Sequence, residues 1–195
     1  MTSTSDVTTA DPEPVRRPRN DVRRNLAALL GAAKTVFATS GVKAPAKQIT
    51  DLAGVGVGTL YRHFPRRSDL IVAVLQHEID DCITAAGTLQ ATLEPFAALQ
   101  AWVDRLIQLV ATKQGLAEAL HSADPAYDGL PDAILDALEP ALGGILDRGT
   151  ASGSIRSDVT AREILVAVAL LCQSVPGEDS GLNERIVRLF VDGLR

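Results

Sequence analysis

The side chains best suited to contact another molecule lie between positions 58 and 64, where the chain reads Gly-Thr-Leu-Tyr-Arg-His-Phe. Tyr61 offers a hydroxyl group, His63 an imidazole, and Arg62 a planar guanidinium that pairs with the edge of guanine or with a phosphate. We expect Gly58 and Thr59 to precede them at the N-terminal end of a short helix that faces the major groove of DNA. Two alternatives remain open, because Tyr61 can pack against the first helix and His63 can be an ordinary surface side chain.

The charge of the chain supports a polyanion as the partner. Residues 16–67 carry eleven Lys or Arg against two Asp, a net charge of +9, whereas residues 68–195 carry −11 and the whole chain −5. A basic segment joined to an acidic remainder is typical of a nucleic-acid-binding module attached to a domain with another task. Five arginines lead into this segment and suit phosphates or a minor groove, with a solubilising tail as the alternative: Arg16, Arg17, Arg19, Arg23 and Arg24.

Other chemistry finds little support. His121, Asp124 and Asp128 form the one grouping that suits acid–base or metal chemistry, but they lie in a Pro/Gly loop and the chain contains no HExxH pattern. Cys82 and Cys172 are about ninety residues apart, without the spacing of a metal site or of a disulfide framework. The sequence therefore predicts no metal and no cofactor, and a helical enzyme is a disfavoured alternative.

The spacing of apolar residues predicts the elements that position residues 58–64. A first helix begins near Asn20 or Asp21 and ends at Gly41, and a second runs from about Pro45 to Leu52, burying Ile49 and Leu52. Residues 53–55 form a tight turn, and the helix that follows at residue 57 stops before Pro65. Short helices joined by a Gly-containing turn match the helix-turn-helix pattern.

The rest of the chain also shows three-and-four spacing, with no sustained alternation at period two, so we predict an all-α fold of about nine helices. Helices are expected at 68–86, 95–114, 131–149, 164–172 and 185–194, with a short one ending near His121 and with Pro140 kinking or dividing the segment 131–149. The length of 195 residues allows one domain or two small ones. We predict a disordered leader with a basic arm at 1–19, a DNA-binding domain at 20–67, and an effector-binding and dimerisation domain at 68–195.

The segment 164–172 is apolar on all sides, which predicts burial on more than one face. We expect it to pair with its copy in a homodimer, together with the last helix, through Ile164, Val168, Leu171, Ile186 and Phe190. The alternative is a helix central to the core of a single chain. Its apolar run is too short to span a membrane, and the leader lacks the apolar stretch of a signal peptide, so we expect a protein of the cytoplasm.

Three motifs follow one another between positions 23 and 75: Phe37-x3-Gly41, Ile49-x3-Ala53-Gly-Val, and Gly58-Thr-Leu-Tyr-Arg-His-Phe64 followed by Arg67 and Leu70. At this spacing they resemble the N-terminal domain of the TetR family of bacterial transcriptional regulators. The resemblance implies an all-helical homodimer that binds palindromic operator DNA and loses affinity when a small molecule occupies its C-terminal domain. Gly56 departs from the family, which usually has a capping Ser there, and Thr50 replaces a small Ala.

By matched position the resemblance implies phosphate contacts from Tyr61, His63 and Arg67, the last at a position where the family commonly has Lys. The complete set of predicted DNA contacts is Lys47, Gln48, Gly58, Thr59, Tyr61, Arg62, His63 and Arg67. For a small-molecule effector the candidates are Trp102, His121 and Tyr127, which are polar-tipped or aromatic and close to where a cavity of the bundle is expected. The alternative places Trp102 in the core and the other two on the surface.

The sequence thus predicts a repressor released from a palindromic operator by a small molecule. A DNA-binding regulator controlled by a protein partner, with no small effector, is the alternative that the sequence leaves open.

Overall fold

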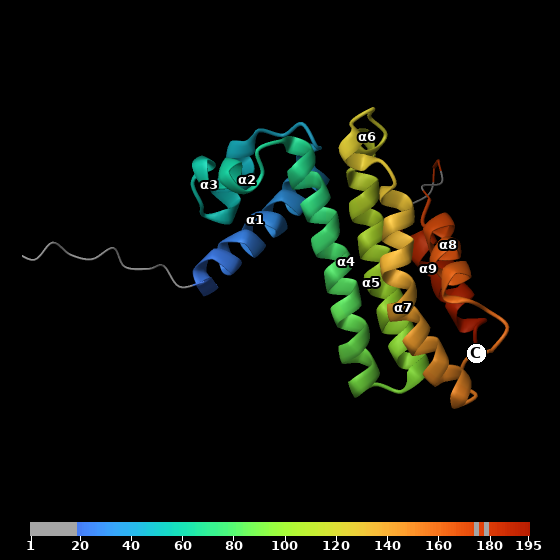
Figure 1. The fold of residues 1–195 in the computed structure, drawn as a ribbon. Coiled ribbons are helices and arrows are strands. Elements are labelled where there is room, and N and C mark those ends of the chain that lie inside the picture. Colours follow the sequence, from blue (N-terminus) through green and yellow to red (C-terminus); the bar gives the residue numbers. More distant parts are fainter. Residues whose placement is uncertain (1–18, 174–175, 178–179) are drawn as a thin grey trace, which may run out of the picture.

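A computed structural model describes residues 19–173, 176–177 and 180–195 (Figure 1). All regular structure within these residues is helical, which confirms the predicted fold class. The elements are α1 (Arg19–Ser40), α2 (Ala46–Ala53), α3 (Val57–His63), α4 (Arg67–Thr92), α5 (Pro95–Gly115), α6 (Ala117–Leu120), the 3-10 helix η1 (Pro125–Tyr127), α7 (Leu130–Ala151), α8 (Ala161–Leu171) and α9 (Ser180–Asp192). The predicted leader falls on residues 1–18, which lie outside the described residues.

The first three helices form a small unit at one end of the molecule (Figure 1). Phe37 of α1, Ile49 of α2 and Leu60 of α3 are buried in its core. Gly54 ends α2 in the left-handed region, with φ of 68°, and its backbone donates to the carbonyls of Thr50 and Asp51. Glycine enters this region without the steric cost that a Cβ brings, so the sharp turn that separates α2 from α3 follows from the residue type.

The structure confirms one expectation for this unit, the backbone cap at Gly56, and contradicts another, the burial of Leu52. Gly56 is the N-cap of α3 and offers no side chain to the cap, as its residue type requires. Leu52 was expected to be buried and is exposed, because the eight-residue α2 turns only the face of Ile49 and Thr50 toward the core.

The remaining helices form a bundle (Figure 1). The long α4 runs from the three-helix unit along the bundle and packs on α5 and α7, while α8 and α9 lie side by side at its far edge. Trp102 of α5 is fully buried, and its ring N–H donates to the carbonyl of Cys82 on α4 over 2.9 Å. Pro140 does not divide α7, which is continuous from Leu130 to Ala151.

The face of α8 that turns inward differs from the predicted one. Ile164 and Val168 are buried within the single chain, with 1% and 0% exposed, so these two residues belong to its own core rather than to a dimer interface. The large apolar side chains that α8 and α9 leave exposed are instead Val166, Leu170 and Leu189. A helix that is apolar on all sides gives no sequence signal for which side faces its own chain.

None of the described helices combines the length and apolar character needed to cross a lipid bilayer.

Candidate DNA-binding surface

The short helix α3 separates its side chains cleanly into a buried and an exposed set. Leu60 is buried against the core, while Gly58, Tyr61, Arg62 and His63 are exposed and Thr59 is half-buried. Tyr61 is 53% exposed. Packing of its ring against α1 is therefore at most partial, and about half of the side chain is open to a ligand.

One exposed residue at the start of α3 was absent from the predicted contacts. Val57 occupies the first position of the helix, next to the Gly56 cap, and is exposed. A small branched apolar side chain at the N-terminal end of a recognition helix can contact the methyl group of thymine. The only signal in the sequence was an apolar residue type at the predicted start of the helix, and its exposure became visible only in the structure.

Lys47 and Gln48 of α2 are also exposed. The Lys47 ammonium lies 2.9 Å from the Asp51 carboxylate, one turn further along the same helix. This exposed ion pair contributes little to stability, so a phosphate can compete for the ammonium. With Arg62 and His63 on α3, the exposed side of α2 and α3 carries cationic and hydrogen-bonding groups.

Arg67 has a different environment from the other predicted contacts. Its Nε donates to the carbonyl of Val42 over 2.8 Å, one terminal nitrogen donates to the carbonyl of Ala44 over 2.7 Å, and the guanidinium lies 4.8 Å from the centre of the Phe37 ring. These contacts fasten the start of α4 to the α1–α2 loop. Arg67 thus has a structural role within the DNA-binding unit, and the phosphate contact implied for its remaining N–H groups stays a prediction.

The neighbouring Arg66 begins α4 in another way. Its backbone N–H and its guanidinium both donate to Asp69, and these contacts hold the pKa of the Asp69 carboxyl below its ordinary value. A carboxylate in the first turn also suits the positive end of the helix dipole. Arg66 and Asp69 therefore determine the residue at which α4 begins, whereas Arg67 holds that end of α4 against the α1–α2 loop.

The three predicted effector residues do not meet around one cavity. Trp102 is enclosed by the core, its only polar group already donating to Cys82. Tyr127 is buried beside α4, where burial raises the pKa of its phenol, and His121 is exposed after α6. The largely apolar hollow of the bundle lies elsewhere, between α5, α7 and α8, with a volume of about 190 Å³. Leu106, Ile134, Leu138 and Leu165 are among its lining residues, with Lys113 and Gln173 as the polar ones.

The grouping that suggested acid–base or metal chemistry has a local structural use. The Asp124 side chain accepts the backbone N–H of Ala126 and so caps η1. In the part of the chain that the structure describes, no three His, Cys, Asp or Glu residues gather as metal ligands would. His121 and Asp124 thus show no arrangement specific to catalysis.

Comparison with known proteins agrees with this geometry. The sequence profile of the tetR family of bacterial regulatory proteins matches residues 29–74, and that of the C-terminal domain of SbtR-like transcriptional regulators matches residues 94–195. The second match alone spans more than half of the chain. The protein belongs to the TetR family of bacterial transcriptional regulators.

Individual TetR-family proteins resemble the chain along most of its length. It is 30% identical to the HTH-type transcriptional repressor KstR2 of Rhodococcus jostii over 145 residues, which are 67% of this chain and 68% of that one. The crystal structure of the regulator SCO0520 from Streptomyces coelicolor superimposes with a TM-score of 0.72 and 36% identity over 87% of this chain and 98% of that one. A regulator from Mycobacterium vanbaalenii gives 0.69 and 33% over 91% and 98%. These relatives are transcriptional regulators rather than enzymes.

Proposed function

We propose that this TetR-family protein is a repressor that binds a palindromic operator as a homodimer and is released from it by a small apolar effector. The observation that carries the proposal is the exposed set on α3, Tyr61, Arg62 and His63, on a helix-turn-helix unit whose segment of the chain has a net charge of +9. The Arg62 fork can read guanine in the major groove, while Tyr61 and His63 hold phosphates.

The second copy of the chain would cover the apolar surface at the far edge of the bundle. Leu170 of α8 is 65% exposed and Leu189 of α9 is 73% exposed, with Val166 one turn before Leu170. Val166 and Leu170 also line the hollow between α5, α7 and α8, so this surface borders the hollow. Leu171, Ile186 and Phe190, which the sequence assigned to the interface, are half-buried beside this surface. Exposed leucines on two helices that pack on each other suit a two-fold pairing in which each surface meets its own copy.

The effector would occupy the hollow between α5, α7 and α8. Its lining is apolar apart from Lys113 and Gln173, which suits an apolar molecule that carries one anionic group for the Lys113 ammonium. All three lining helices belong to the bundle, and α5 and α7 pack on α4. An effector that spreads these helices therefore acts on the helix that enters the DNA-binding unit.

The operator is tested first. Full-length protein is used to select binding sequences from a pool of random double-stranded DNA, and the affinity of the selected sequence is measured at increasing salt. We expect two inverted half-sites and an affinity that falls steeply with salt, because phosphate contacts release counterions. Selection of no sequence, or of a site without inverted symmetry, would contradict the proposal.

The effector is tested on the selected DNA with octanoate and decanoate as anionic probes and with decylammonium as the matched cation. We expect the carboxylates to release the protein from DNA and the cation to have no effect. Ala169→Trp fills the hollow from α8 and should remove this release while DNA binding persists. Regulation by a protein partner instead of a small molecule would leave all three probes without effect.

A further inference from the structure

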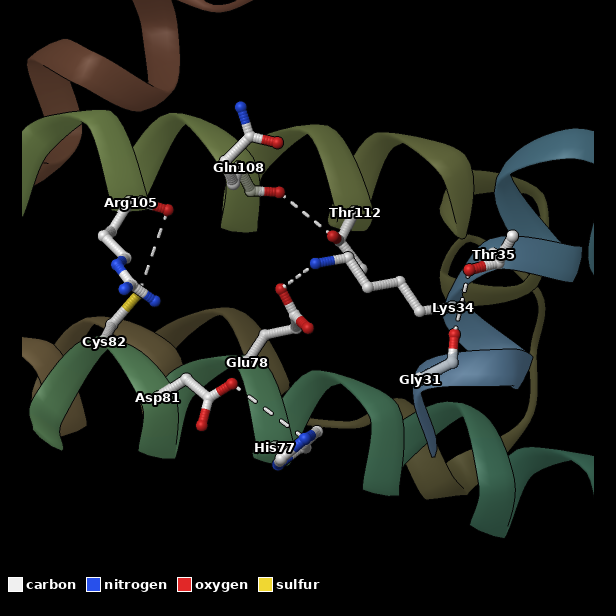
Figure 2. A network of polar contacts seen from close by, with 10 residues as sticks. All are labelled: Gly31, Lys34, Thr35, His77, Glu78, Asp81, Cys82, Arg105, Gln108 and Thr112. Carbon is white, nitrogen blue, oxygen red and sulfur yellow. Dashed lines mark hydrogen bonds and ion pairs between the residues drawn. The ribbon is translucent and has the colours of Figure 1, made fainter. Parts of the chain in front are cut away.

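An ion pair joins the DNA-binding unit to the rest of the chain at a point away from the hydrogen bonds of Arg67. Lys34 of α1 extends between α4 and α5, and its ammonium lies 2.5 Å from a carboxylate oxygen of Glu78 on α4 (Figure 2). The two residues are 44 positions apart in the sequence. One belongs to the helix that packs on α2, the other to the helix that begins the bundle.

Two hollows flank this pair, at the edge of the surfaces where α1 packs on α4 and α5. A hollow of about 390 Å³ lies beside it between α4 and α5, and a second of about 170 Å³ lies between α1 and α5. Lys34 and Gln108 line both hollows.

Glu78 depends on its partner more than a surface carboxylate does. Its side chain is only 13% exposed, whereas that of Lys34 is 38% exposed. The nearby Asp81 is directed toward His77 on its own helix, and the Cys82 thiol contacts the carbonyl of Arg105 (Figure 2). A carboxylate with little access to water loses most when its cation is withdrawn, so any movement of α1 that removes Lys34 is disfavoured.

The distance between this pair and Arg67 along α4 determines how strongly the pair constrains the angle between α1 and α4. Arg67 fastens the first residue of α4 to the α1–α2 loop, and Glu78 follows eleven residues later, about 16 Å further along the helix at 1.5 Å per residue. The apolar face of α1 also packs on α4. A polar attachment at this distance from Arg67 adds to that packing and constrains the angle between α1 and α4.

We infer that Lys34 and Glu78 are a positioning pair that sets the angle of the DNA-binding unit on α4, and through it the separation of the two α3 helices in the dimer. This inference rests on the proposed function. The pair touches no DNA and acts through geometry, so its loss should change which half-site spacing is preferred as well as how tightly DNA is bound.

The experiment reverses the charges singly and together. Lys34→Glu and Glu78→Lys should each weaken binding to the selected operator about tenfold and remove the preference for its spacing over versions lengthened or shortened by one base pair. The double variant K34E/E78K should restore both properties to within about twofold. Arg162→Glu and Asp136→Lys, at an exposed ion pair between α7 and α8, are the matched charge controls and should leave both properties unchanged.

Two outcomes would overturn the inference. Single reversals that leave affinity and spacing preference unchanged would show that the pair positions nothing. If Lys34→Glu weakens binding, Glu78→Lys strengthens it and the double variant shows no restored spacing preference, then Lys34 acts through its charge on DNA rather than through Glu78.

A measurement without DNA separates this inference from the proposed operator. Glu78→Gln should increase amide hydrogen exchange in α1 of the full-length protein while exchange in α7 stays at its wild-type rate. If the wild-type protein selects no DNA sequence but this increase is found, the proposed function fails and the attachment of α1 by the pair stands. Unchanged exchange in α1 contradicts the inference whatever DNA the protein binds.

Discussion

Replacing Arg67 by Lys should destabilise the protein although the charge is kept. The guanidinium donates to two carbonyls, those of Val42 and Ala44, and covers the Phe37 ring. A Lys ammonium reaches one of these carbonyls but cannot donate to both through a planar fork. A hydrogen bond from a charged group contributes about 1.5–3 kcal/mol, and the half-buried position places the loss near the lower end, at about 2 kcal/mol. For a chain of this size that corresponds to roughly 4–8 °C in the melting temperature.

The assay compares unfolding by urea and by heat for the wild type, Arg67→Lys and the neighbouring Arg66→Lys. Arg66 is exposed and pairs with Asp69, so its variant should unfold at the wild-type midpoint. The reasoning would be refuted if Arg67→Lys also unfolded at that midpoint while Arg67→Met lowered the slope of log affinity against log salt by about one. A change of one in that slope is the signature of a lost phosphate contact.

Three further predictions concern the DNA surface, the dimer and the thiols. Tyr61→Ala and Arg62→Ala should each lower operator affinity about tenfold or more while sedimentation still shows the oligomeric state of the wild type. Retained affinity in both variants would mean that α3 is not the recognition helix. Leu170→Asp should give a folded monomer, whereas Val168→Asp should unfold the chain by burying a charge, as circular dichroism and sedimentation would show; a folded Val168→Asp dimer would contradict this assignment of faces. Burial raises the pKa of the Cys82 thiol to about 11, so the thiol should react with a disulfide reagent at pH 8 only after unfolding. The free energy of unfolding should fall as the pH rises from 9 toward 11, because the thiol of the unfolded chain loses its proton at a lower pH than the buried one. Rapid reaction of the native thiol would show that it is not buried.

The parts of the fold that followed from the sequence are those that local chemistry determines. A glycine after α2 and a proline after α3 mark the turn and the stop, and both lie where those residue types require. The polar and basic residues of 58–64 lie on the outer side of α3 because Leu60 is the one large apolar residue between Val57 and Phe64, so it turns inward. Charge distribution and motif spacing then point to the same surface.

The roles of Arg67, Val168 and Trp102 depend on what the rest of the chain places around them. An arginine that follows a recognition helix has the same sequence signature whether or not it also donates to two backbone carbonyls, and only the closeness of the α1–α2 loop reveals those contacts. On α8 the residues Val166 and Val168 are the same type two positions apart, yet Val166 is 39% exposed and Val168 is fully buried. An apolar pattern therefore predicts that a helix is covered but not by which surface, and this is why the dimer contact has to be tested at Leu170 and Leu189 rather than at the residues whose spacing first suggested it.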